Sequence, residues 1–110
     1  MKKYILIVDD EKDICLTLSK ILSSKGFSVI IASNSDAAIN RIKNTSIDLV
    51  LLDVWLEGSK KNGLELLKIM RNYNPDTPVI LISGHANIDI AVKAIKEGAF
   101  YFIEKPFKSE

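Results

Sequence analysis

Near its start the chain reads Tyr4-Ile5-Leu6-Ile7-Val8-Asp9-Asp10-Glu11, five apolar residues followed by three acids. An apolar run without polar alternation predicts a strand that is buried on both faces, and the acids predict its exposed carboxyl end. Four more runs of this kind follow, at Ser28–Ala32, Asp48–Leu52, Pro78–Ile82 and Phe100–Ile103. The sequence therefore predicts five short strands.

The segments between these runs have the apolar spacing of helices. Their stripes are Ile14, Leu18, Ile21 and Leu22, then Ala38, Ile39 and Ile42, then Leu66, Leu67 and Met70, and finally Ile88, Ala91, Val92 and Ile95. Ser35 is the expected N-cap of the second helix, and Asn62 with Glu65 resembles a capping box before the third. Gly26 and Gly98 are expected to end the first and fourth helices.

Strands that alternate with helices imply right-handed crossovers and a parallel sheet. We expect an α/β, doubly wound, flavodoxin-like sheet of five strands in the order 2-1-3-4-5. Residues 1–110 would form one domain, because 110 residues leave no room for a second. Few residues follow the fifth strand, so the last helix of such a fold is expected to be largely missing, and the chain to be an N-terminal fragment of a longer protein.

Composition excludes several classes of function. The net charge is only +1, so nothing in the overall charge indicates binding to nucleic acid or anionic lipid. The single cysteine, Cys15, excludes an internal disulfide and a metal cluster of several cysteines. No apolar run approaches the roughly 20 residues of a membrane span, and no export signal is visible. We therefore expect a cytoplasmic protein.

Side chains able to bind phosphate and a cation follow the strands. Asp9 and Asp10 come after the first strand, Asp53 after the third, Ser83 after the fourth and Lys105 after the fifth. Strands one and three would be neighbours at the switch point of the sheet, where ligands bind. Three converging carboxylates need a positive partner, and hard oxygen ligands suit Mg²⁺. Asp53 is then the candidate nucleophile for a phosphoryl group, with Ser83 and Lys105 holding its oxygens.

Four motifs together resemble the receiver domain of two-component response regulators. They are Ile-Leu-Ile-Val-Asp9-Asp10-Glu11, Asp48-Leu-Val-Leu-Leu-Asp53, Ile82-Ser83-Gly84-His85 and Lys105-Pro106-Phe107. The resemblance covers essentially the whole chain and implies the CheY-like version of the fold. The stretch from Asp53 to Gly63 looks more specifically like the NtrX type, within the NtrC-class family.

The resemblance implies that a sensor histidine kinase phosphorylates Asp53. Asp10, Asp53 and the backbone carbonyl of Trp55 would ligate Mg²⁺, and Asp9 would act through the water shell of the metal. Ser83 and Lys105 would bind the phosphoryl oxygens.

The resemblance also implies how the phosphorylated domain would pass on its signal. Phe102 would occupy the aromatic switch position together with Ser83, and the face of the fourth helix and fifth strand would form a homodimer. DNA would be bound only by domains absent from this chain, and no membrane partner is implied. The domain would assist its own phosphorylation and dephosphorylation without being an enzyme for another substrate.

One departure from the family concerns the loop after Asp53. Gly63 lies ten positions after Asp53, a longer spacing than is usual in receivers, and Glu57 stands where proline is common. Glu57 is a hypothetical modulator of metal binding or of the phosphoryl lifetime.

Other functions on the same fold compete with this interpretation. A nucleotide or flavin enzyme is disfavoured, since the first turn holds acids in place of a glycine-rich phosphate loop. A haloacid-dehalogenase-like phosphatase would need an acid where Trp55 stands. Ser83 and His85 are poorly placed for a hydrolase pair. A receiver-like interaction module that is never phosphorylated stays open as the alternative.

Overall fold

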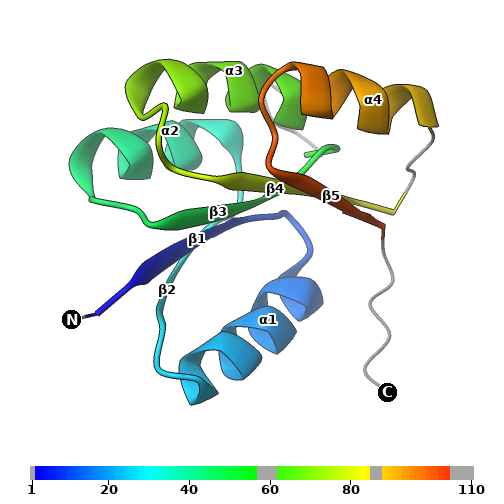
Figure 1. Ribbon diagram of the computed structural model, residues 1–110. Helices are drawn as coiled ribbons and strands as arrows, with labels where there is room; N and C mark the ends of the chain where they lie inside the picture. Colours follow the sequence, from blue (N-terminus) through cyan, green and yellow to red (C-terminus); the bar gives the residue numbers. More distant parts are fainter. Residues whose placement is uncertain (1, 57–61, 85–87, 105–110) are drawn as a thin grey trace.

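The computed structural model describes residues 2–56, 62–84 and 88–104. Strands and helices alternate along the chain (Figure 1). Their bounds are β1 (Tyr4–Val8), α1 (Lys12–Ser24), β2 (Ser28–Ala32), α2 (Ser35–Asn44), β3 (Leu49–Asp53), α3 (Gly63–Tyr73), β4 (Val79–Ser83), α4 (Ile88–Lys96) and β5 (Tyr101–Glu104). Every predicted strand and helix is thus present.

The five strands form one parallel sheet in the order β2-β1-β3-β4-β5, which confirms the predicted doubly wound topology. β1 lies between β2 and β3, with Ile7 opposite Ile31 on one side and Leu51 on the other. β3 pairs with β4, and β4 with β5. The strand order reverses between β1 and β3, which is where a ligand site is expected.

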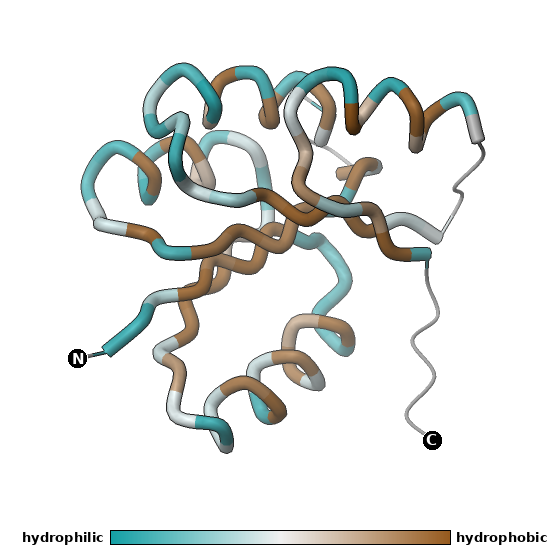
Figure 2. The backbone as a smooth tube through the Cα atoms, in the orientation of Figure 1, coloured by the Kyte–Doolittle hydropathy of each residue, from teal (hydrophilic) through white to brown (hydrophobic). Residues whose placement is uncertain are grey.

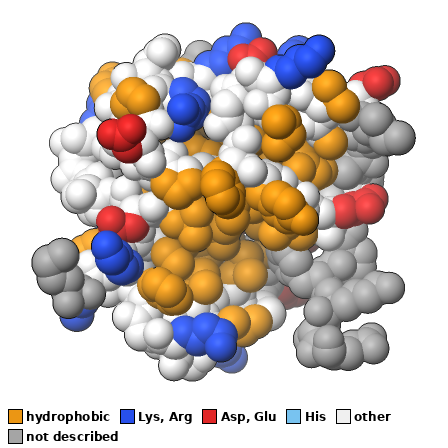
Figure 3. Space-filling model, in the orientation of Figure 1, with side chains coloured by type: hydrophobic (Ala, Val, Ile, Leu, Met, Phe, Trp, Pro, Cys, Tyr) orange, Lys and Arg blue, Asp and Glu red, His pale blue; other side chains and the backbone are white. Residues whose placement is uncertain are grey.

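Helices lie on both faces of the sheet. α2, α3 and α4 cover one face and α1 lies on the other (Figure 1). The described residues end with β5 at Glu104. Hydrophobic side chains gather on the surface beside α1 (Figure 3). The described helices are all too short or too polar to span a bilayer.

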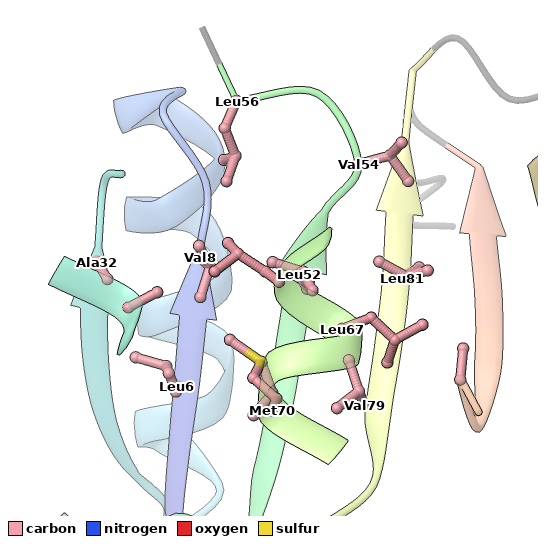
Figure 4. Close-up of a cluster of buried hydrophobic side chains, with 14 of the residues drawn as sticks. Leu6, Val8, Ala32, Leu52, Val54, Leu56, Leu67, Met70, Val79 and Leu81 are labelled. Atoms are coloured by element: carbon pink, nitrogen blue, oxygen red, sulfur yellow. The ribbon is translucent and has the colours of Figure 1, made fainter. Parts of the chain in front are cut away.

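The core is built from the central strands, which are the most hydrophobic part of the backbone (Figure 2). The larger cluster joins β1, β3 and β4 to α3, where Leu52, Leu67 and Met70 are almost fully buried (Figure 4). A second cluster around Ile7 and Ile82 packs against α1. Burial of each such aliphatic side chain stabilises the fold by about 1.5–3 kcal/mol.

Three helix boundaries agree with the sequence and one does not. The capping box of Asn62 and Glu65 is present at α3, and Gly26 and Gly98 follow α1 and α4 with φ +95° and +105°. Ser35, however, is the first residue of α2 and not its N-cap. Asn34 caps this helix, because its side-chain oxygen reaches the Ala37 N–H at 2.8 Å, while Ser35 is buried.

The apolar stripe expected on α4 also needs correction. Val92 and Ile95 are 47% and 49% exposed, and the residue buried against the core is Ala94. Ile90 packs partly buried against the same core cluster, whereas Val92 and Ile95 point away from it. The sequence spacing identified the helix correctly but not its buried side.

Candidate functional site

Three aspartates meet at the carboxyl ends of β1 and β3. Asp9 and Asp10 follow β1, and Asp53 is the last residue of β3. One carboxylate oxygen from each residue lies within 4.8 Å of the other two. Asp9 and Asp53 are buried, with 3% and 4% exposure, and Asp10 is half-buried. The sequence expectation that these three side chains converge is thus met.

A hydrogen bond from the backbone N–H two residues later orients two of these carboxylates. Asp9 Oδ1 accepts a hydrogen bond from the Glu11 N–H at 2.9 Å, and Asp53 Oδ1 accepts one from the Trp55 N–H at 3.3 Å. An aspartate that bonds to the backbone two residues later forms a turn that fixes its own side chain. Each strand therefore ends in a turn that holds its carboxylate at the site.

The donor set fits a hard divalent cation. Negative charges this close repel one another, and partial burial weakens the screening by water. The oxygens offered are all carboxylate oxygens, which suit Mg²⁺ and would leave other positions to water and phosphate. Asp9, Asp10 and Asp53 are accordingly the residues that could hold the metal.

Three other predicted residues lie on β4, on β5 and in the turn after β3. Ser83 is fully buried at the end of β4, directly after Ile82, which pairs with Asp53. Trp55 follows the phosphoacceptor candidate and is 45% exposed. Phe102 is half-buried in β5 and packs against the larger core cluster. Its neighbour across the ladder is Leu81 of β4.

Several predicted features lie outside the described residues. These are Lys105 with Pro106, Glu57 in the loop after β3, and His85 after β4. Their proposed roles stay predictions.

Sequence reasoning missed two features of the site. Gly63 at the start of α3 lies against the backbone of Asp53, and only its position before an apolar helix hinted at this. A surface pocket of about 240 Å³ also adjoins the acidic cluster. It is lined by Asp9, Asp10, Lys12, Cys15, Leu16, Ile31 and Ser33.

Comparison with known proteins agrees with this geometry. The family model of the response regulator receiver domain matches residues 5–110. The nitrogen assimilation regulatory protein NtrX of Azorhizobium caulinodans is 49% identical over 110 residues, which is all of this chain and 24% of that protein. A crystal structure of NtrX from Brucella abortus has a TM-score of 0.92 at 47% identity, over 99% of this chain and 24% of that one.

A smaller solved structure also matches. The solution structure of the beryllofluoride-activated NtrC4 receiver domain dimer has a TM-score of 0.89 at 39% identity, over 96% of this chain and 85% of that one. The chain spans about a quarter of the NtrX relatives and most of this isolated receiver. It therefore belongs to the response regulator receiver domain family, and its similarity to the NtrX type is confirmed.

Proposed function

We propose that this domain is a phosphorylation-dependent switch in which Asp53 accepts a phosphoryl group from a sensor histidine kinase, with Mg²⁺ as cofactor. The observation that carries the proposal is the meeting of Asp9, Asp10 and Asp53 at the switch point of the sheet. A buried carboxylate among other acids has little use in a purely structural core, because its desolvation costs free energy.

The proposed reaction is a phosphoryl transfer between two side chains. An oxygen of Asp53 attacks the phosphorus of a phosphohistidine, the phosphorus–nitrogen bond breaks, and its electron pair returns to the imidazole of the donor. The product is an acyl phosphate on Asp53. When bound, Mg²⁺ would supply positive charge against the carboxylates and the phosphoryl oxygens.

Residues of this chain would orient the acceptor and bind the product. The Trp55 N–H holds Asp53 Oδ1 and so sets the direction of the carboxylate. Asp10, Asp53 and the Trp55 carbonyl would be the metal ligands, with Asp9 acting through water. Ser83 would donate its hydroxyl to a phosphoryl oxygen, and Lys105 would pair with another. The same groups would position water for the later hydrolysis of the acyl phosphate.

The conformational change caused by phosphorylation would pass through β4 and β5. A phosphoryl group adds about two negative charges. Ser83 would move toward these charges, and Phe102, which lies on the neighbouring strand, would turn inward into the vacated space. This would shift the balance between two states of the α4–β5 surface. The ladder between Leu81 and Phe102 supports this route, since it joins the strand of Ser83 to that of Phe102.

The output surface would be an apolar patch on α4, β5 and the segment between them, called here the edge patch. Its large exposed residues are Val92, Ile95, Phe100 and Tyr101. We propose that it pairs two copies of the domain, as the NtrC4 receiver forms a dimer. In a longer cytoplasmic regulator the dimer would control transcription through DNA-binding domains outside this chain.

The deciding experiment is incubation of the chain with Mg²⁺ and acetyl phosphate, followed by intact mass measurement. We expect a gain of one phosphoryl group, which EDTA and the Asp53→Ala variant both abolish. Asp76→Ala is the matched control, because Asp76 is exposed and far along the chain from the three aspartates.

No gain in the unmodified chain, or an undiminished gain in Asp53→Ala, would overturn the proposal. The first result would favour the alternative, a receiver-like interaction module that is never phosphorylated.

A further inference from the structure

We propose that Gly63 is a positioning residue for Asp53: its missing side chain lets the start of α3 clamp the Asp53–Val54 peptide in the geometry that metal binding and phosphoryl transfer need. This inference rests on the proposed function and assigns a role to a residue outside the acidic cluster.

Gly63 lies in direct contact with the backbone of the acceptor residue. Its N–H donates to the Val54 carbonyl at 2.7 Å. A Cβ atom on Gly63 would lie 2.3 Å from the Asp53 carbonyl oxygen and 2.6 Å from the Val54 Cα. Both are backbone atoms, so no side chain can rotate away to make room.

The same peptide is also hydrogen-bonded to β4. The Val54 N–H donates to the Ile82 carbonyl at 3.1 Å. Val54 is therefore bonded through its N–H to β4 and through its carbonyl to α3. The next N–H, that of Trp55, bonds to Asp53 Oδ1. A shift of this clamped peptide would thus move both the Asp53 carboxylate and the Trp55 main chain.

α3 cannot easily retreat from the contact. Its first turn is fixed by the reciprocal bonds of Asn62 and Glu65, each 3.0 Å long. Leu66 and Leu67, in the next turn, are fully buried in the core. A side chain at position 63 would therefore displace the Asp53–Val54 peptide in preference to the helix. Displacements of even 1 Å at a reacting group can cost on the order of a hundredfold in rate.

The first test compares Gly63→Ala with Gly98→Ala. Gly98 has φ +105° and a Cβ there would meet the Arg71 side chain, so this control strains the fold away from the site. Mg²⁺ affinity is measured by titrating MgCl₂ against the fluorescence of Trp55, the sole tryptophan. The phosphorylation rate with acetyl phosphate is measured by intact mass. Stability in urea with EDTA reports the structural cost alone.

We expect Gly63→Ala to weaken Mg²⁺ binding about fivefold or more and to slow phosphorylation about tenfold or more. Gly98→Ala should change both by less than about twofold, even where it loses as much stability. In metal-free protein, the amide resonances of Val54 and Trp55 should shift in Gly63→Ala only. Equal Mg²⁺ affinities and rates in the two glycine variants would overturn the proposal.

A second pair of variants keeps the test decisive if Gly63→Ala does not fold. Asn62→Ala loosens the start of α3 without adding atoms, and Asn34→Ala removes the equivalent cap of α2. Asn62→Ala should lower Mg²⁺ affinity about two- to threefold more than Asn34→Ala, since only the former loosens the clamp. Equal affinities in this pair would also overturn the proposal. Failure of the unmodified chain to gain phosphate would instead reject the proposed function.

Discussion

The acidic end of the central strands and the edge patch use apolar residues in opposite ways. Residues flanking the aspartates in β1 and β3, such as Val8 and Leu52, have no exposed surface. In the edge patch, Val92 is 47% and Phe100 72% exposed. Burial holds the proposed acceptor in one geometry, whereas the edge keeps apolar surface for a partner. We therefore expect stability to reside in the centre and association at the edge.

The largest expected effect comes from removing a buried side chain near the site. Ile82 is 3% exposed, and Ile82→Ala should lower the free energy of unfolding by about 3 kcal/mol through lost burial and a cavity. Ile95→Ala makes the same chemical change in the edge patch and should cost less than about 0.5 kcal/mol. Urea unfolding followed by Trp55 fluorescence measures both. Similar losses would mean that the edge is as well packed as the centre.

A smaller effect is expected from charge repulsion at the acidic end. Asp53→Asn replaces one of three close carboxylates with a neutral amide of the same shape. Without Mg²⁺ this should raise the free energy of unfolding by about 1 kcal/mol, because the repulsion of Asp53 with each of the other two carboxylates is removed. Urea unfolding in EDTA measures the change, and the exposed Asp76→Asn serves as control. A loss of stability in Asp53→Asn would show that the aspartates are compensated within the chain.

The sequence predicted the fold because each strand is a continuous apolar run. Strand ends were predicted less well: β3, β4 and β5 each lie one residue further along than the apolar runs indicated. Asp53 and Ser83 belong to the strands because the backbone ladder continues past the last apolar side chain, with Asp53 opposite Ile82 and Ser83 opposite Glu104. Hydropathy therefore predicts which residues of a strand lie in the core, while backbone hydrogen bonding determines where the strand ends.

The site was predictable where it depends on topology and unpredictable where it depends on close packing. Asp9, Asp10 and Asp53 could be brought together from the strand order alone. The contact between Gly63 and the Asp53 carbonyl could not, because it depends on how a helix returns after the intervening loop. The exposed side of α4 was missed for the same reason. Which residues of α4 face the core depends on how the helix packs on the sheet, and the buried residue is Ala94.

Substitutions in the edge patch should weaken association of the domain and hardly change its stability. Ile95→Ser should change the free energy of unfolding by less than about 0.5 kcal/mol, because Ile95 is half-exposed on α4. We expect it to weaken dimerisation of the phosphorylated domain by about tenfold, measured by sedimentation after treatment with acetyl phosphate. Leu16→Ser, at a 55% exposed position on α1, should leave dimerisation unchanged. Unchanged dimerisation in Ile95→Ser would exclude the edge patch as the interface.

The smallest expected effect concerns the ion pair between Lys68 of α3 and Glu97, just after α4. The two charged groups lie 3.5 Å apart, but the Lys68 side chain is 59% exposed. An exposed pair of this kind contributes at most about 0.5 kcal/mol, since water and salt screen it. Lys68→Ala should therefore lower stability by no more than this amount in urea unfolding, and Lys93→Ala, at an exposed position on α4, gives the background. A loss several times larger that disappears in high salt would mean that charge, and not the burial of Ala94, fixes α4 to the domain. The contrast between a rigid centre and a loosely held edge would then be wrong.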